Sequence, residues 1–151
     1  MFERILALFK KSSGPVVPLP LLDARRTLGA LMVRTARSDK SYKLAEVHTI
    51  ESIFISAFGL SEDQAPEMRK ICEDLEKQLP RTADLAVILQ AAISEEQRMQ
   101  AVWALWTVAL ADGIKHEAEV AVLDEVEKVF GISAENSQLL REYLPKIDEP
   151  E

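Results

Sequence analysis

The sequence predicts an all-α protein, a single helical domain of about seven to eight helices. Apolar residues recur at three- and four-residue spacing in successive segments, the periodicity of helices that bury one face. No segment alternates apolar and polar residues in the way that is typical of a strand. The chain has 151 residues, and 48% of them are hydrophobic, which suits one domain with a substantial core.

The first predicted element is an amphipathic helix over residues 1–11. Its apolar residues Phe2, Ile5 and Phe9 share one face, and two lysines end it, where cations favour the helix dipole. Residues 12–20, SSGPVVPLP, contain a glycine and three prolines and predict an extended linker. We therefore expect residues 1–11 to be tethered, and either to dock on the main domain or to rest on a membrane surface or a partner.

Residues 21–145 are expected to form the main domain, and residues 146–151 a frayed tail. Helices are predicted over residues 22–38, 44–58, 61–79 and 83–93, from 94 onward, over 117–130, and from 133 to Pro145. Arg26, Arg34 and Arg37 lie opposite the apolar stripe of the first of these helices, which indicates a solvated face.

Several residues mark where these helices begin and end. Ser61 and Ser94 are each followed three residues later by glutamine, which predicts capping boxes at these starts. Thr82 is expected to cap the short helix that follows it. Gly59 and Gly131 follow apolar rows and predict helix ends.

Composition excludes several classes of protein. The net charge of −7 argues against a nucleic-acid-binding domain, which is usually basic. Cys72 is the only cysteine, so no intrachain disulfide can form, and we expect it to be a small apolar residue on a helix. The longest apolar run, residues 101–111, is too short to span a bilayer of ~30 Å, and we expect Trp103 and Trp106 within it to be core residues. These features predict a soluble protein.

Two parts of the sequence match each other. When Asp39 is aligned with Asp112, Glu46 falls on Glu119. Both stretches read as a helix, then D-x6-E, then a second helix that ends in F-G-[LI]-S. The pattern predicts two helical hairpins related by duplication.

Both glutamates lie on the apolar row of their helix. From Glu119 the positions four, seven and eleven residues on are Leu123, Val126 and Phe130, and Glu46 precedes a similar row. A charged group that faces a core costs several kcal/mol, on the order of an unpaired polar group, unless it finds partners. A glutamate stands on the apolar row at the same position in both copies, and this needs a physical explanation.

Two explanations are open. The glutamates could accept free backbone N–H groups in the first helical turn, while the aspartates lock the loops. Alternatively, Asp39, Glu46, Asp112 and Glu119 could together hold a divalent cation, for which calcium, magnesium and manganese suit oxygen ligands. The loops lack the EF-hand pattern, and spacing alone favours the structural role, because short acidic motifs often match by chance.

The stretches ARSDKSYKLAEV (36–47) and ALADGIKHEAEV (109–120), with their F-G-[LI]-S ends, resemble the TerB-like family, named for tellurite resistance protein TerB. The resemblance runs from about Leu28 to the last helix. It implies an all-helical domain of two related halves, cytoplasmic or facing the inner membrane, and linked to tellurite resistance and other stresses. It also implies a metal at the four acidic positions and no established catalytic activity. Lys40 stands where the family often has glycine, and its charge would weaken a site in the first loop.

No other motif indicates an enzyme. His48 and His116 are the only histidines, and a single imidazole beside acidic residues is weak evidence for zinc. The chain has no glycine-rich phosphate loop. We therefore expect a non-enzymatic, metal-binding or metal-stabilised helical module that interacts with a protein partner. The alternative is a metal-independent adaptor, peripheral to the inner membrane through residues 1–11, and a metal-dependent hydrolase is a distant third.

Overall fold

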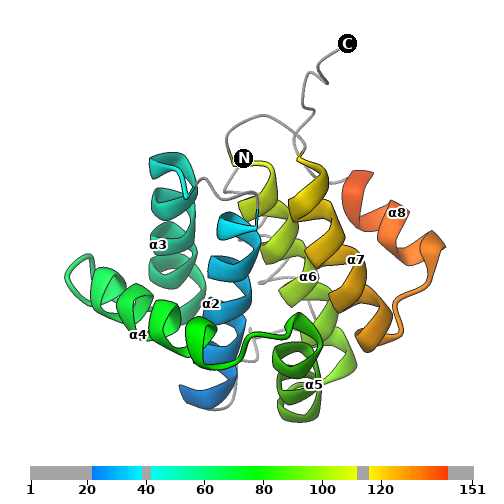
Figure 1. Ribbon diagram of the computed structural model, residues 1–151, viewed down its shortest axis with the longest axis horizontal. Helices are drawn as coiled ribbons and strands as arrows, with labels where there is room; N and C mark the ends of the chain where they lie inside the picture. The colour runs from blue at the N-terminus through cyan, green and yellow to red at the C-terminus, as the bar shows by residue number, and fades with distance from the viewer. Residues whose placement is uncertain (1–21, 39–41, 112–115, 143–151) are drawn as a thin grey trace.

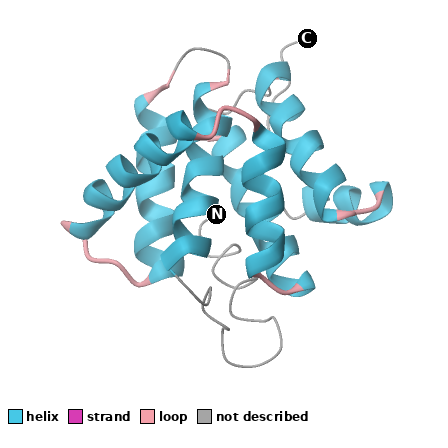
Figure 2. Cartoon of the chain, turned by 60° about the horizontal axis from the view of Figure 1, so that its bottom comes forward, coloured by secondary structure: helices cyan, strands magenta, loops and turns pink. Residues whose placement is uncertain are grey.

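The computed structural model describes residues 22–38, 42–111 and 116–142, and every regular element in these ranges is a helix (Figures 1 and 2). The helices are α2 Leu22–Arg37, α3 Leu44–Phe58, α4 Gln64–Gln78, α5 Thr82–Ala92, α6 Glu95–Ala109, α7 Glu117–Phe130 and α8 Ala134–Glu142. The predicted all-α fold is confirmed. The predictions for residues 1–11, the linker 12–20, Pro145 and the tail 146–151 lie outside the described residues.

Local signals set most of the helix boundaries. At the start of α6, the Ser94 hydroxyl oxygen accepts a bond from the Gln97 N–H at 3.2 Å, and Gln97 Oε1 accepts one from the Ser94 N–H at 2.8 Å. The same reciprocal pair of bonds joins Ser61 to Gln64 before α4. These are the two predicted capping boxes, and each satisfies backbone donors that the helix itself leaves open.

Gly59 and Gly131 end α3 and α7 in the left-handed region, with φ angles of 71° and 69°. Both predicted helix ends are therefore confirmed. A side chain at either position would be strained, because residues with a Cβ rarely adopt this conformation.

The duplication is visible in the arrangement of the helices. Helices α6 and α7 begin 73 residues after α2 and α3, respectively. Helix α2 packs against α3 and α4 of its own half and against α6 and α7 of the other, while α6 packs against α7, α8, α2 and α3. The contacts between the halves are reciprocal, since α2 packs against α7 and α6 packs against α3, and α2 and α6 also pack against each other. Helix α5 connects the halves and packs against α2 and α7.

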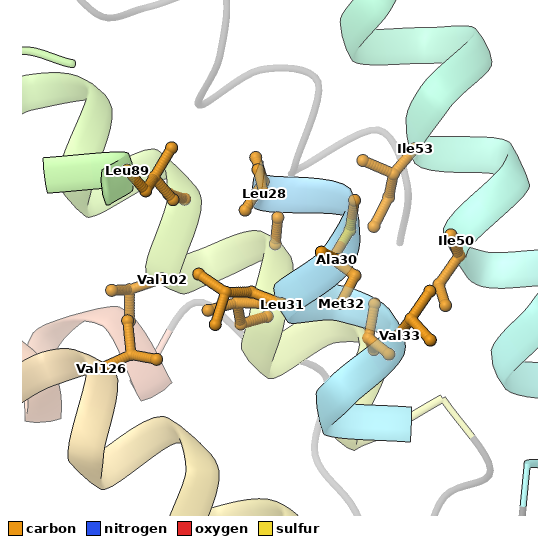
Figure 3. Packing of buried hydrophobic residues seen from close by; sticks show 14 of the residues in the cluster. Leu28, Ala30, Leu31, Met32, Val33, Ile50, Ile53, Leu89, Val102 and Val126 are labelled. Carbon is orange, nitrogen blue, oxygen red and sulfur yellow. The ribbon is translucent and has the colours of Figure 1, made fainter. Parts of the chain in front are cut away.

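The core surrounds α2 (Figure 3). Leu31 points towards Val102 of α6 and Val126 of α7, whereas Val33 lies on the side of Ile50 of α3. All five side chains are fully buried. Burying one such side chain stabilises the folded protein by about 1.5–3 kcal/mol. Because α2 buries side chains against helices of both halves, these contacts hold the two halves together.

A close approach between α2 and α4 depends on Gly29. A Cβ atom at this position would overlap Cys72 Sγ and lie 3.0 Å from Phe54 Cζ. Cys72 is fully buried, as expected of a small apolar residue, and burial raises the pKa of its thiol to about 12. Glycine therefore lets these two helices pack at short range.

The arginine stripe of α2 does not form the predicted solvated face. Arg34 donates to Glu76 Oε2 at 2.7 Å and to the carbonyl oxygens of Glu76 and Leu79 at 2.8 and 2.6 Å. Its guanidinium thus caps the end of α4, and Arg37 Nη1 lies 3.6 Å from Glu76 Oε1. The prediction was wrong because α4 covers this face, and the periodicity of one helix does not reveal its neighbours.

Thr82 does not cap α5 as predicted. The helix begins at Thr82 itself, with Arg81 at the N-cap position. The Thr82 hydroxyl instead accepts a bond from Arg34 Nη1 at 3.2 Å.

Trp103 and Trp106 are core residues as predicted, each 1% exposed. Among the described residues, no helix combines the length and the apolar character that a membrane crossing requires.

Candidate metal centre at the junction of the two halves

Glu46 lies in the first turn of α3 and is 1% exposed. Lys43 precedes the helix with extended backbone angles, and its N–H donates to Glu46 Oε1 at 3.0 Å. Ile50 and Ile53, one and two turns further on, are also buried. The prediction that this glutamate faces the core is therefore confirmed, and the first helical turn favours its negative charge.

Glu119 occupies the equivalent place in α7 and is fully buried. His116 precedes that helix, also with extended backbone angles. Its Nε2 atom lies 3.8 Å from Glu119 Oε1. Leu123, Val126 and Phe130 are buried along the same row, so this glutamate also faces the core as predicted.

The two helix starts meet. Lys43 Nζ lies 3.5 Å from His116 Nε2. These residues are 73 positions apart, the same separation as between the paired helices, so they are equivalent in the duplication. This contact joins the starts of α3 and α7 and is called the junction of the two halves. Glu46 and Glu119 each lie three residues after a member of the pair, in the first turns of the two helices.

The remaining two predicted ligands, Asp39 and Asp112, lie outside the described residues. In the sequence they stand between α2 and α3 and between α6 and α7, and each is seven residues before its glutamate. In the part of the chain that the structure describes, no three histidine, cysteine, aspartate or glutamate side chains form a group that could hold a metal ion. A metal centre at this junction therefore requires the loop aspartates.

Comparison with known proteins agrees with this arrangement. A family model described as tellurite resistance protein TerB matches residues 25–142, which include both halves and both acidic hairpins. The chain belongs to the TerB family. Neither the curated proteins nor the solved structures give a significant match to it.

The donors at the junction of this TerB domain suit hard divalent cations. Glu46 and Glu119 supply carboxylate oxygens, which calcium, magnesium and manganese prefer. His116 adds an imidazole nitrogen 3.8 Å from Glu119, and nitrogen donors also suit zinc. His48 is exposed on α3. Lys43 brings a positive charge to the same place, and its ammonium group cannot bind a metal.

A polar cluster of the TerB domain flanks the site on α3 and α4. Arg69 donates to Glu51 Oε2 at 2.7 Å and to Glu73 Oε2 at 2.6 Å. Burial and Glu73 raise the pKa of Tyr42 above its usual value, so its hydroxyl remains protonated. The Arg37 guanidinium lies over the Tyr42 ring, 5.7 Å from its centroid. Since Tyr42 immediately precedes Lys43, this cluster holds the chain at the entrance to α3.

Proposed function

We propose that this TerB domain binds a divalent cation at the junction of its two halves and acts as a metal-responsive, non-enzymatic interaction module in tellurite resistance. The observation that carries the proposal is that Glu46 and Glu119, one from each half, are both almost fully buried in the first turns of the two helices whose starts meet. The family description provides the link to tellurite resistance.

A bound cation would offset an unfavourable term in the fold. Removing a carboxylate from water costs several kcal/mol, on the order of what is found for buried ions after relaxation, unless opposite charge compensates it. A calcium, magnesium or manganese ion would supply that charge. It would be held by Glu46 and Glu119 together with Asp39 and Asp112 of the adjoining loops. Because the ligands come from both halves, binding would couple the two hairpins.

Exposed apolar side chains support a role in protein interaction. Leu44 is 69% exposed, the highest value among the large apolar side chains that the structure describes. It follows Lys43 directly and so lies at the edge of the proposed centre. Exposed apolar side chains become contacts when a partner covers them. A cation bound beside Leu44 would therefore change the surface offered to a protein partner.

The second candidate is a metal-independent helical adaptor. It is favoured by the bond from the Lys43 N–H to Glu46 Oε1, which is the local capping contact that a purely structural role predicts. In that case the acidic residues stabilise the hairpins, and partner binding does not respond to metal. Peripheral attachment to a membrane through residues 1–11 is part of this second proposal.

Equilibrium dialysis with metal analysis distinguishes the two candidates. Chelator-treated wild-type protein would be dialysed against calcium, magnesium, manganese or zinc, in parallel with Glu46→Gln and Glu119→Gln. Glu125→Gln is the matched control, because Glu125 is exposed on the same helix as Glu119. We expect one cation per chain in wild type and control, with binding at least about tenfold weaker in the two junction variants. Retention of no cation by wild-type protein would leave the adaptor as the function.

A further inference from the structure

Among the residues that the structure describes, Lys43 brings a cationic side chain from the first half to the junction. Its Nζ lies 3.5 Å from His116 Nε2, which in turn lies 3.8 Å from Glu119 Oε1. These two distances place the ammonium group within about 7 Å of the Glu119 carboxylate, a range at which partly buried charges still interact strongly. Its own backbone N–H holds Glu46. Lys43 therefore touches the site through both its main chain and its side chain.

We propose that Lys43 is a tethered cation of the acidic junction, which neutralises the carboxylates in the metal-free protein and competes with a divalent cation for them. The competition rests on the proposed function, whereas the neutralisation does not. Buried carboxylates remain ionised at modest cost only when positive charge lies near them. The Lys43 ammonium group brings such a charge to the contact between the two helix starts.

The duplication explains why one lysine serves both halves. The residue equivalent to Lys43 in the second half is His116, and the two side chains are in contact. A second lysine there would place two ammonium groups in contact, and like charges at that distance repel. An imidazole in the second copy avoids the repulsion. The junction is therefore asymmetric in charge although it is nearly symmetric in fold.

Lys43 should have opposite effects on the two states of the protein. Without metal, its ammonium group lowers the free energy of the buried carboxylates and stabilises the fold. With metal, the same charge lies beside a doubly charged ion and weakens its binding. Replacing Lys43 with methionine removes the charge and keeps the apolar stem. It also leaves the backbone N–H that donates to Glu46 in place.

The test compares Lys43→Met and Lys43→Arg with wild type. Lys70→Met serves as control, since Lys70 is exposed on α4. Thermal midpoints would be measured in chelator, and the dissociation constant of manganese by equilibrium dialysis. We expect Lys43→Met to have a lower metal-free midpoint than wild type and to bind manganese about tenfold or more tightly. Lys43→Arg and Lys70→Met should behave like wild type in both measurements.

Either of two results overturns part of this proposal. A metal-free midpoint of Lys43→Met equal to that of wild type shows that Lys43 does not neutralise the junction. Manganese binding to Lys43→Met that is no tighter than to wild type shows that Lys43 does not compete. If manganese binds neither protein, the proposed metal function fails along with the competition, and the metal-free midpoint still decides the neutralisation.

Discussion

Arg34→Met should destabilise the protein by about 3–5 kcal/mol, the cost of removing one partner from a buried ion pair. The Arg34 and Glu76 side chains are only 12% and 14% exposed, so little of this effect is lost to solvent screening. The guanidinium also donates to the carbonyl oxygens of Glu76, Leu79 and Pro80. Its loss therefore leaves the end of α4 uncapped and leaves the Glu76 carboxylate with only the longer contact to Arg37, at 3.6 Å.

Urea-induced unfolding followed by circular dichroism at 25 °C measures the loss of stability in Arg34→Met. Arg34→Lys should recover less than half of it, because an ammonium group cannot reproduce the planar fork that contacts several acceptors at once. The control is Arg81→Met, since Arg81 is exposed before α5 and its replacement should change stability by no more than about 0.5 kcal/mol. If Arg34→Met lowers the free energy of unfolding by less than about 1 kcal/mol, the prediction is wrong. Such a result would mean that the bonds from Arg34 to the end of α4 contribute little net stability.

Three further predictions concern packing, capping and pH. Gly29→Ala should lower the free energy of unfolding by about 1–3 kcal/mol, because the added methyl group overlaps Cys72. In a double-mutant cycle, adding Cys72→Ala should restore part of this loss, and purely additive losses from the two substitutions would contradict the overlap. Ser94→Ala should cost about 1 kcal/mol in chemical unfolding because the Gln97 N–H loses its acceptor, and an unchanged midpoint would show that the cap is dispensable. Because burial raises the pKa of the Cys72 thiol from 9.0 to about 12, the unfolded chain ionises first as pH rises. The contribution of Cys72 to stability should therefore be intact below pH 9 and decline between pH 9 and 12, and this decline should be smaller in Cys72→Ala.

Much of the fold could be predicted because its signals are local. Apolar rows, serine capping boxes and the two glycines place the helix boundaries within a few residues of those observed, and the bounds of α3 and α7 agree fully. The burial of Glu46 and Glu119 also followed from local spacing, since each glutamate begins an apolar row. Duplication then indicated that the two rows belong to equivalent helices.

The remaining features depend on packing between helices, which spacing within one helix does not encode. Arg34 and Thr82 were misjudged because their bonds join α2 to the end of α4 and the start of α5. The contact between Lys43 and His116 was missed for a similar reason. Aligning the two halves does pair these residues, but only the packing of the halves in the structure shows that they meet.

The central claim is that the two halves share one divalent cation at their junction. Its most direct test is the anomalous scattering from crystals of the protein grown with manganese. We expect a single strong peak within about 2.6 Å of carboxylate oxygens of both Glu46 and Glu119, with Asp39 and Asp112 as further ligands. It would be contradicted by a junction without a peak in crystals that bind manganese elsewhere, or by separate ions held within each hairpin.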